Sequence, residues 1–207
     1  MIIEEKEIKL DLDNEENYKR LIGHFKNITT VIQINTFFDT AENDLMNSGW
    51  ALRIREIEGQ FFITAKGMNR KGSLKLAIRP EIQEEIGKQK ATVMLAEGFT
   101  KNDLPAQILE ELNDIIMHDK FMKLVTFNTK RTTIAYETNS YSVQLEIDKT
   151  EYADHTVDYE LEIEIPVADI QDKVIEQVRA LLERLNIPFI FQKYSKFGRA
   201  LKKNGSE

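Results

Sequence analysis

Residues 5–9 read Glu5-Lys6-Glu7-Ile8-Lys9, and a similar stretch far downstream reads Glu160-Leu161-Glu162-Ile163-Glu164. In both runs charged side chains recur at every second position, which is the period of a β-strand. Neighbouring positions on one face of a strand lie roughly 6.6 Å apart, close enough for two carboxylates to share one cation. The two stretches therefore predict strands with an acidic face opposite an apolar face, as in the wall of a charged lumen with an apolar exterior.

The composition sets the class of protein. The chain has 207 residues, of which 42% are hydrophobic and 30% charged, which is ordinary for a globular protein with a substantial core. The absence of cysteine excludes disulfides and thiolate metal sites and fits a reducing compartment. The net charge of −7 argues against general nucleic-acid binding, which needs a basic surface.

No feature of the sequence predicts contact with a membrane. The first residues carry acids where a signal peptide needs a basic region followed by an apolar stretch. No apolar run is long enough to span a bilayer as a helix. We therefore expect a cytoplasmic protein that binds neither membranes nor nucleic acid. The sequence leaves the oligomeric state open, with a homodimer among the options.

Eight strand-like segments dominate the chain. Gly59, Asn139-Ser140 and the stretch 67–72 supply turn residues between neighbouring segments. Eight strands joined by short turns favour a closed antiparallel barrel over a parallel sheet, so we predict an α+β fold, an eight-stranded antiparallel β-barrel with helices packed outside. The predicted strands are 2–12, 30–38, 50–58, 60–66, 73–86, 123–137, 141–150 and 157–165.

Helical signals lie between these strands. Asn14 is a candidate N-cap with Glu15 and Glu16 in the first turn, and it predicts a helix that ends near Phe25. Further helices are predicted at 88–95, at 103–117 and at 169–185, the last one stopped by Asn186 and Pro188. We expect one domain over residues 1–207, with a helical insertion at about 87–121.

Alternation also sorts each strand into two faces, provided that no bulge intervenes. For any single strand, a solvated outer face over an apolar core is the favoured interpretation. Six or seven strands with charges at nearly every second position instead favour a shared lumen. Trp50 falls in step with Leu52 and Ile54, which assigns it to the apolar face. The sets that share a face are Arg53 and Arg55; Phe62, Thr64 and Lys66; Arg79, Glu81, Gln83 and Glu85; Thr129 and Arg131; Gln144, Glu146 and Asp148; and Asp158, Glu160, Glu162 and Glu164.

An enclosed lumen of this kind needs ligands. Each desolvated ion costs several kcal/mol, so buried charges must find partners. A polyphosphate with a divalent metal satisfies both signs of charge at once. Arginine and lysine bind phosphoryl oxygens, and carboxylates bind Mg²⁺ or Mn²⁺.

An ordered set of motifs resembles the CYTH, or triphosphate tunnel metalloenzyme, superfamily, which includes class IV adenylyl cyclases and thiamine triphosphatases. The resemblance covers essentially the whole chain, and the ordered set is far more specific than any one motif. The motifs are Glu5-x-Glu7-x-Lys9, Phe38-Asp39-Thr40, Leu45-x-x-x-Gly49-x-x-Leu52-Arg53-Ile54-Arg55, Thr64-x-Lys66-Gly67, Thr129-Lys130-Arg131, the strand with Asp148, Glu160-Leu161-Glu162-Ile163-Glu164 and Ser195-Lys196.

The resemblance implies a role for each matching residue. Glu162 and Lys9 are the implied catalytic residues, with Mg²⁺ or Mn²⁺ as the cofactor. Lys193 competes with Lys196 for the terminal lysine role, and we choose Lys196 because Ser195 precedes it. The implied metal ligands are Glu5, Glu7, Asp148, Glu160 and Glu162, and the implied phosphate-binding residues are Lys9, Arg53, Arg55, Lys66, Arg79, Arg131 and Lys196.

The chain also departs from the family at one point. Phe37-Phe38 stands where many relatives carry a tyrosine, and this removes a hydroxyl that could orient water or phosphate.

The leading functional hypothesis is metal-dependent hydrolysis of a small-molecule triphosphate. Inorganic triphosphate is favoured over thiamine triphosphate or a nucleoside triphosphate, because no element for recognising an organic group is evident in the sequence. Two alternatives stay open: a class IV-type adenylyl cyclase, and a polyphosphate- or nucleotide-binding module without turnover.

Overall fold

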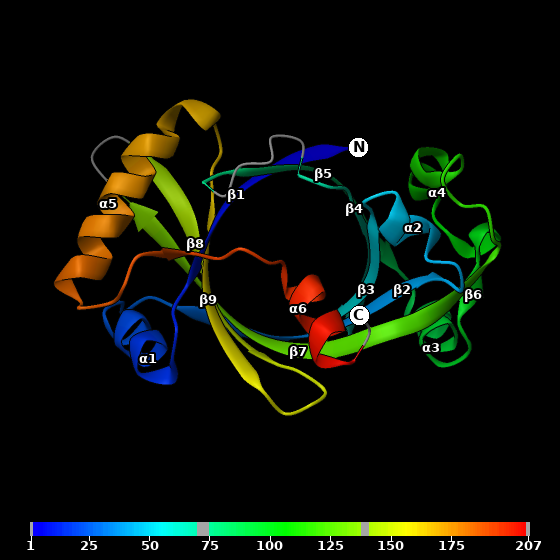
Figure 1. Ribbon diagram of the computed structural model, residues 1–207, viewed down its shortest axis with the longest axis horizontal. Coiled ribbons are helices and arrows are strands. Elements are labelled where there is room, and N and C mark those ends of the chain that lie inside the picture. The colour runs from blue at the N-terminus through cyan, green and yellow to red at the C-terminus, as the bar shows by residue number, and fades with distance from the viewer. Residues whose placement is uncertain (1, 70–74, 138–140, 206–207) are drawn as a thin grey trace.

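A computed structural model describes residues 2–69, 75–137 and 141–205 of the chain. Its long strands form one antiparallel sheet in the order β1-β5-β4-β3-β2-β7-β8-β9, and β1 also pairs with β9, which closes the sheet into a barrel (Figure 1). The predicted eight-stranded antiparallel barrel is confirmed. Its strands are β1 (Ile3–Asp11), β2 (Thr29–Thr40), β3 (Ala51–Ile57), β4 (Gln60–Lys66), β5 (Ala77–Ile86), β7 (Lys120–Glu137), β8 (Ser142–Glu151) and β9 (Val157–Glu164).

Two short strands extend this sheet without having been predicted. β6 (Phe99–Thr100) pairs with the start of β7, and β10 (Ile190–Phe191) pairs with the end of β1. The predicted turn Asn139-Ser140 lies outside the described residues, as do residues 70–72 of the predicted 67–72 loop and the beginning of the predicted strand 73–86.

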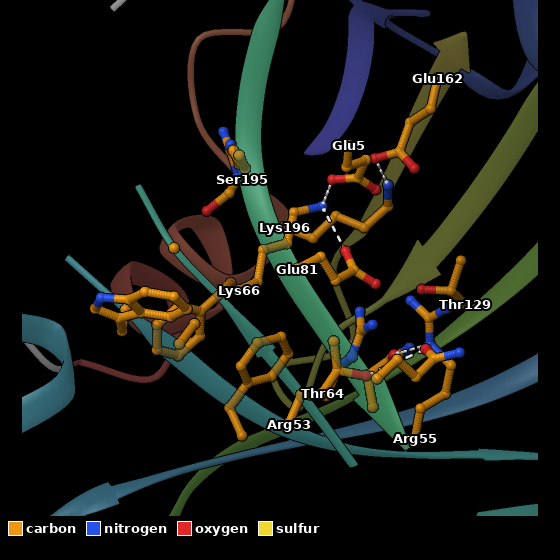
Figure 2. A pocket seen from close by; sticks show the side chains of 18 of the residues that line it. Glu5, Arg53, Arg55, Thr64, Lys66, Glu81, Thr129, Glu162, Ser195 and Lys196 are labelled. Carbon is orange, nitrogen blue, oxygen red and sulfur yellow. Dashed lines mark hydrogen bonds and ion pairs between the residues drawn. The ribbon is translucent and has the colours of Figure 1, made fainter. Parts of the chain in front are cut away.

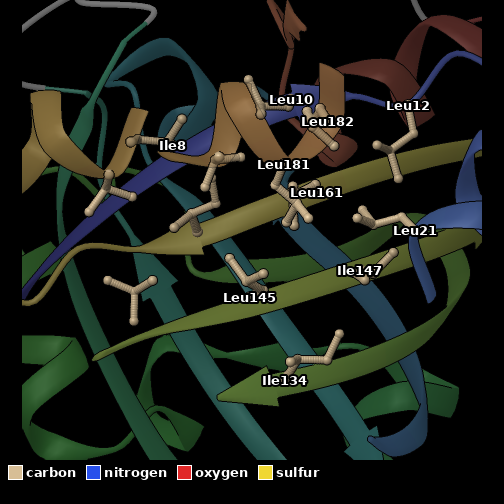
Figure 3. Packing of buried hydrophobic residues seen from close by; sticks show 14 of the residues in the cluster. Ile8, Leu10, Leu12, Leu21, Ile134, Leu145, Ile147, Leu161, Leu181 and Leu182 are labelled. Carbon is tan, nitrogen blue, oxygen red and sulfur yellow. The ribbon is translucent and has the colours of Figure 1, made fainter. Parts of the chain in front are cut away.

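One apolar cluster lies on the outer face of β1, β8 and β9. Ile8, Leu145 and Leu161 point away from the barrel interior and pack against Leu181 of α5 (Gln171–Arg184) and Leu21 of α1 (Glu15–Gly23) (Figure 3). Full burial of each such aliphatic side chain contributes about 1.5–3 kcal/mol. As predicted, Asn14 caps α1, because its side chain accepts a hydrogen bond of 3.0 Å from the Asn17 backbone N–H. The short turn η2 (Ala168–Ile170) precedes α5.

A second apolar cluster lies on the outer face of β3, β4 and β5. Leu52 and Ile63 pack there against residues of α3 (Lys88–Glu97), such as Met94, and of α4 (Ala106–Leu112), such as Ile108. A helix predicted at 103–117 is wrong in its bounds. Asp103 caps the 3₁₀ turn η1 (Lys101–Asp103) by accepting from Thr100, and α4 starts only after Pro105.

Two short helices lie near the barrel ends. α2 (Asp44–Asn47) follows β2 and is capped by Asp39 of the Phe38-Asp39-Thr40 motif, whose carboxylate accepts hydrogen bonds from the Leu45 and Met46 backbone N–H groups. α6 (Lys196–Lys203) begins at Ser195, whose hydroxyl accepts from the Gly198 N–H at 3.1 Å. Its Phe197 and Ala200 pack on Phe37 and Phe127 of β2 and β7. None of the helices described is long and apolar enough to cross a membrane.

Candidate functional site

The barrel encloses a cavity of about 520 Å³ that is lined by charged side chains from most of its strands (Figure 2). Nine of the twelve residues that the sequence singles out line this cavity. The other three, Glu7, Asp148 and Glu160, are buried in its wall, where they contact Lys9, Lys66, Arg131 or Lys196. The nine are Glu5, Lys9, Arg53, Arg55, Lys66, Arg79, Arg131, Glu162 and Lys196.

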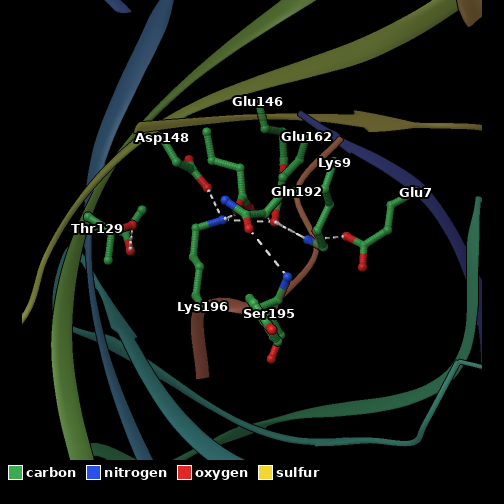
Figure 4. A network of polar contacts seen from close by, with 12 residues as sticks. Glu7, Lys9, Thr129, Glu146, Asp148, Glu162, Gln192, Ser195 and Lys196 are labelled. Atoms are coloured by element: carbon green, nitrogen blue, oxygen red, sulfur yellow. Dashed lines mark hydrogen bonds and ion pairs between the residues drawn. The ribbon is translucent and has the colours of Figure 1, made fainter. Parts of the chain in front are cut away.

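Acidic residues gather on the adjacent strands β8, β9 and β1. Asp148 lies directly opposite Glu160 in the register of β8 and β9, and Glu146 lies opposite Glu162. Like charges in directly opposed positions destabilise a sheet unless cations compensate them. Lys196 supplies one such cation, because its Nζ lies 2.8 Å from Asp148 Oδ2, 2.6 Å from Glu160 Oε1 and 2.8 Å from Glu162 Oε1 (Figure 4).

Arg131 and Lys9 also compensate the acids of β8, β9 and β1, which form an acidic wall of the cavity. Arg131 donates from Nε and Nη2 to the two oxygens of Asp148, at 2.9 and 2.6 Å, and from Nη2 to Glu162 Oε2 at 2.5 Å. Lys9 contacts Glu162 directly and lies 2.8 Å from Glu7 Oε2. Burial alone would raise the pKa of Glu162, but Lys196, Lys9 and Arg131 outweigh it and hold that pKa well below its usual range.

Other acids near the cavity keep their protons more readily. Burial raises the pKa of Glu5, and Glu7 beside it raises the pKa further. Burial raises the pKa of Glu160 although Lys196 and Lys9 act against it. Burial likewise raises the pKa of Glu146 to about 7, against the opposing effect of Arg131. The neighbouring lysines and arginines therefore do not fully compensate the acids of β1, β8 and β9, and an additional cation would favour their ionised forms.

Arginines without acidic partners lie on β3 and β5. Among the described residues, no carboxylate lies within ion-pair distance of Arg53, Arg55 or Arg79, and the buried Nε atoms of Arg53 and Arg79 have no hydrogen-bond partner. Arg55 Nε donates to Asn35 Oδ1 at 2.9 Å. Burial, with repulsion from Arg53 and Arg131, lowers the pKa of Arg55 to about 9. Buried guanidinium groups in this condition favour an anion with several oxygens, such as a phosphate chain.

Lys66 lies between the acids of β1 and the arginines of β3 and β5. Its Nζ contacts Glu5 directly and lies 3.4 Å from Glu7 Oε1 and 3.5 Å from Glu81 Oε2. Burial would raise the pKa of Glu7, but Lys66 and Lys9 outweigh it and lower that pKa to about 2. Glu7 is therefore ionised at neutral pH.

Part of the cavity lining is aromatic. Phe37 stacks on Phe197 of α6 with ring centroids 4.4 Å apart, and on Phe127 at 5.6 Å. Trp50 and Met68 also line the cavity. Trp50 packs against the second apolar cluster, as the sequence predicts, but its place in the cavity lining was not predicted. β3 begins only at Ala51, and strand alternation therefore does not apply to Trp50, which touches both the cavity and the second apolar cluster.

Some lining residues were not identified from the sequence. Gln33 and Asn35 of β2 line the cavity and are buried, while Ile32 and Ile34, which alternate with them, are exposed. The alternation of apolar and polar residues at 32–35 could have predicted that Gln33 and Asn35 face the cavity. The choice between the two terminal lysines agrees with the geometry: Lys196 lies among the acids, whereas Lys193 is exposed.

The acids fit a divalent cation by their donor chemistry. Carboxylate oxygens are the ligands that Mg²⁺ and Mn²⁺ prefer. Within the described ranges no three Asp, Glu or His side chains are grouped as ligands of one ion, and lysines and Arg131 contact the oxygens of these acids. A bound cation in this wall would therefore have to share or replace those contacts.

The family follows from a match over most of the chain, since the CYTH domain model matches residues 4–190. The chain belongs to the CYTH family. It is similar to HpAC1 from Hippeastrum, a candidate adenylyl cyclase with a dominant triphosphatase activity: 28% identity, TM-score 0.83, 98% of this chain and 97% of that chain covered.

Two further solved structures are similar to the chain. A candidate adenylate cyclase from Bacillus halodurans is 26% identical, with a TM-score of 0.76 and coverage of 96% and 97% of the two chains. The PH1819 protein from Pyrococcus horikoshii, at 20% identity, a TM-score of 0.60 and coverage of 95% and 99%, shares the fold. A comparison with curated protein sequences found no match.

Proposed function

We propose that this CYTH protein is a divalent-metal-dependent triphosphatase that releases the terminal phosphate of a small-molecule triphosphate. One observation carries the proposal. Three guanidinium groups, those of Arg53, Arg55 and Arg79, have no acidic partner among the described residues and line the same cavity as Glu162. The acids on that side differ in pKa, which is raised at Glu160 and lowered at Glu162. A triphosphate with a cation complements both sides.

The arginines would bind and align the phosphate chain. Arg53 and Arg55 occupy alternate positions of one strand, so both can contact consecutive phosphoryl groups. Catalysis of phosphoryl transfer depends mainly on positioning and on fixed positive charge around the transferring group. Lys9 and Lys196 lie opposite, among the acids, and would neutralise charge at the reacting end of the chain.

The acids Glu5, Glu7, Asp148, Glu160 and Glu162 would hold the cation. When bound, Mg²⁺ or Mn²⁺ supplies charge neutralisation at phosphate oxygens and lowers the pKa of a bound water. Glu162 stays ionised at neutral pH because three cations lower its pKa. Such a carboxylate is a weak base, so its role would be to accept a hydrogen bond from the attacking water and to orient it.

Inorganic triphosphate is the first substrate to test, and the aromatic lining favours a second. Trp50, Phe37 and Phe197 line the cavity that also holds Arg53. A flat organic ring attached to the triphosphate can stack on such residues, whereas inorganic triphosphate has no apolar surface to use them. An organic triphosphate, either thiamine triphosphate or ATP, is therefore the second candidate.

Phosphate release measured with all three substrates and each divalent cation tests the proposal. We expect metal-dependent release by the wild type and a loss of about 100-fold or more in kcat for Glu160→Gln and Arg55→Ala. Arg184→Ala, at an exposed position of α5, serves as the control and should behave like the wild type. Equal rates in all four proteins would refute the proposal.

Product analysis separates the alternatives. Cyclic AMP and pyrophosphate from ATP would identify a cyclase. Tight, metal-dependent triphosphate binding in calorimetry without phosphate release would identify a binding module.

A further inference from the structure

Helix α6 contacts both carboxylate oxygens of Glu160. Lys196 Nζ lies 2.6 Å from Glu160 Oε1, and Arg199 Nη2 lies 2.8 Å from Glu160 Oε2. Lys196 and Arg199 are three residues apart, so both contacts come from one face of the first turn of the helix. Glu160 itself is only 1% exposed.

Arg199 is held in place by further acceptors. Its Nε donates to Asp158 Oδ2 at 2.7 Å and to the Tyr152 hydroxyl at 3.1 Å, and its Nη1 donates to the Tyr194 carbonyl at 2.6 Å. These partners come from β9, from the residue that follows β8 and from the segment before α6. The guanidinium therefore has a fixed orientation, and Arg199 is not among the residues that line the cavity.

A ligand in the cavity would affect the contact of Lys196 with Glu160 but not the contact of Arg199 with Glu160. Lys196 lines the cavity and shares its charge among Asp148, Glu160 and Glu162, so a phosphate oxygen in the cavity competes for its ammonium group. Arg199 does not line the cavity, and it forms an ion pair with the other oxygen of Glu160, although the geometry of these two atoms is not that of a hydrogen bond. It can keep that carboxylate oriented when Lys196 turns toward a ligand.

We propose that Arg199 is a positioning residue, which holds Oε2 of Glu160 and so would keep this carboxylate oriented for a cation bound by the acidic residues of the cavity wall. This inference rests on the proposed function, because it assigns Glu160 to the cation-binding wall. Groups that orient metal-ligating side chains through such outer contacts typically contribute 10–100-fold to metal affinity or activity.

Lys203 provides a matched control. Its Nζ lies 2.8 Å from Asp158 Oδ1 and 4.2 Å from the centroid of the Tyr152 ring, so it joins α6 to the same two residues as Arg199 does. It has no contact with Glu160. A change that acts only by loosening α6 should therefore appear in Lys203→Met as well as in Arg199→Met.

The experiment compares full-length wild type with Arg199→Met, Arg199→Lys and Lys203→Met. Mn²⁺ affinity is measured from the electron paramagnetic resonance signal of free Mn²⁺, without substrate. The kcat and KM values for inorganic triphosphate and for Mn²⁺ are measured separately, and circular dichroism checks that each variant is folded.

We expect Arg199→Met to weaken Mn²⁺ binding and lower kcat by about 10–100-fold. Arg199→Lys should recover part of the loss, because one ammonium group can contact Glu160 but cannot also keep the other three contacts of the guanidinium. Lys203→Met should remain within about threefold of the wild type, as expected when only an anchoring contact is lost.

Equal losses in Arg199→Met and Lys203→Met, or wild-type Mn²⁺ affinity in Arg199→Met, would overturn the inference. Failure of the proposed function gives a different result. A wild type that hydrolyses no triphosphate but binds Mn²⁺ more tightly than Arg199→Met does would refute the triphosphatase and support the role of Arg199.

Discussion

Glu160 and Glu162 point to the same side of β9, yet their surroundings shift their pKa values in opposite directions. Burial raises the pKa of Glu160, whereas Lys196, Lys9 and Arg131 together overcome burial at Glu162. The same residue type therefore has two different proton affinities two positions apart. This difference places a carboxylate that ionises readily, suited to orienting water, next to one whose ionisation a bound cation would favour.

Lys196 is the residue whose loss should disturb this balance most. Lys196→Met removes one shared partner of Asp148, Glu160 and Glu162, and removing one partner from a buried ion pair costs about 3–5 kcal/mol. We expect that loss in urea unfolding with EDTA present. Mg²⁺ should then stabilise the variant more than the wild type, because the freed carboxylates gain a cation.

Lys202→Met is the control on the same helix, since Lys202 is exposed and its side chain, within the described part of the chain, lies against the ring of Tyr194 without an ion pair. It should change the free energy of unfolding by less than about 1 kcal/mol. The same response to Mg²⁺ in both variants would contradict the assignment of these acids to a cation.

Among the elements, α2 and the segment after α4 are joined by one carboxylate. Asp44 Oδ2 accepts from the Met117 and His118 backbone N–H groups at 2.9 and 2.8 Å. Burial would raise the pKa of Asp44, but these bonds and the His118 side chain outweigh it and lower that pKa. A carboxyl group with a lowered folded-state pKa stabilises the protein above its unfolded pKa of about 3.9 and loses this effect as the pH falls through the folded value.

Asp44→Asn should therefore cost about 1.5–3 kcal/mol at pH 7, and the difference from the wild type should disappear as the pH falls below about 4. Urea unfolding between pH 3 and pH 7 measures it, and faster hydrogen exchange at the Met117 and His118 amides would locate it. His118→Ala keeps both backbone donors and should have a smaller effect. A pH-independent difference would show that the charge of Asp44 is not the cause.

The long elements could be predicted because their patterns repeat. Strands such as β1 and β9 alternate over several residues, and α1 has both a capping residue and acids in its first turn. β6 and β10 have two residues each, too few to show any period. α6 has eight residues and carries Gly198 in its first turn, which weakens a helical signal. Its position depends on packing of Phe197 against Phe37, which sequence periodicity does not encode.

The site could be predicted where strand alternation holds. Arg53 and Arg55 line the cavity because β3 alternates regularly between Ala51 and Ile57. Trp50 precedes that strand, so the alternation did not predict its place in the cavity lining. The contact of Arg199 with Glu160 joins α6 to β9, which are far apart in the sequence, so no local sequence pattern predicts this contact. The roles of these residues in binding a metal or phosphate stay predictions.

On the scale of the whole molecule, the barrel has its apolar side chains outside and its charges inside. The outer faces are buried under α1 and α5 on one side and under α3 and α4 on the other. Closure through the pairing of β1 with β9 leaves the barrel without a free edge along these strands. The apolar clusters can therefore provide the stability, while the interior keeps charges that oppose folding.

Arg53→Met tests this division between stability and binding. Without a ligand, the substitution removes a buried charge that lacks an acidic partner, and we expect the protein to gain about 1–3 kcal/mol in urea unfolding. With triphosphate at about 100 times its Kd, the wild type should gain about 2.7 kcal/mol by mass action, and the variant should gain far less because its affinity is reduced. The exposed Arg184→Met should show the wild-type ligand response and no gain. If Arg53→Met were destabilised without ligand and fully stabilised by triphosphate, then Arg53 would be a structural residue and the phosphate chain would lie elsewhere in the barrel.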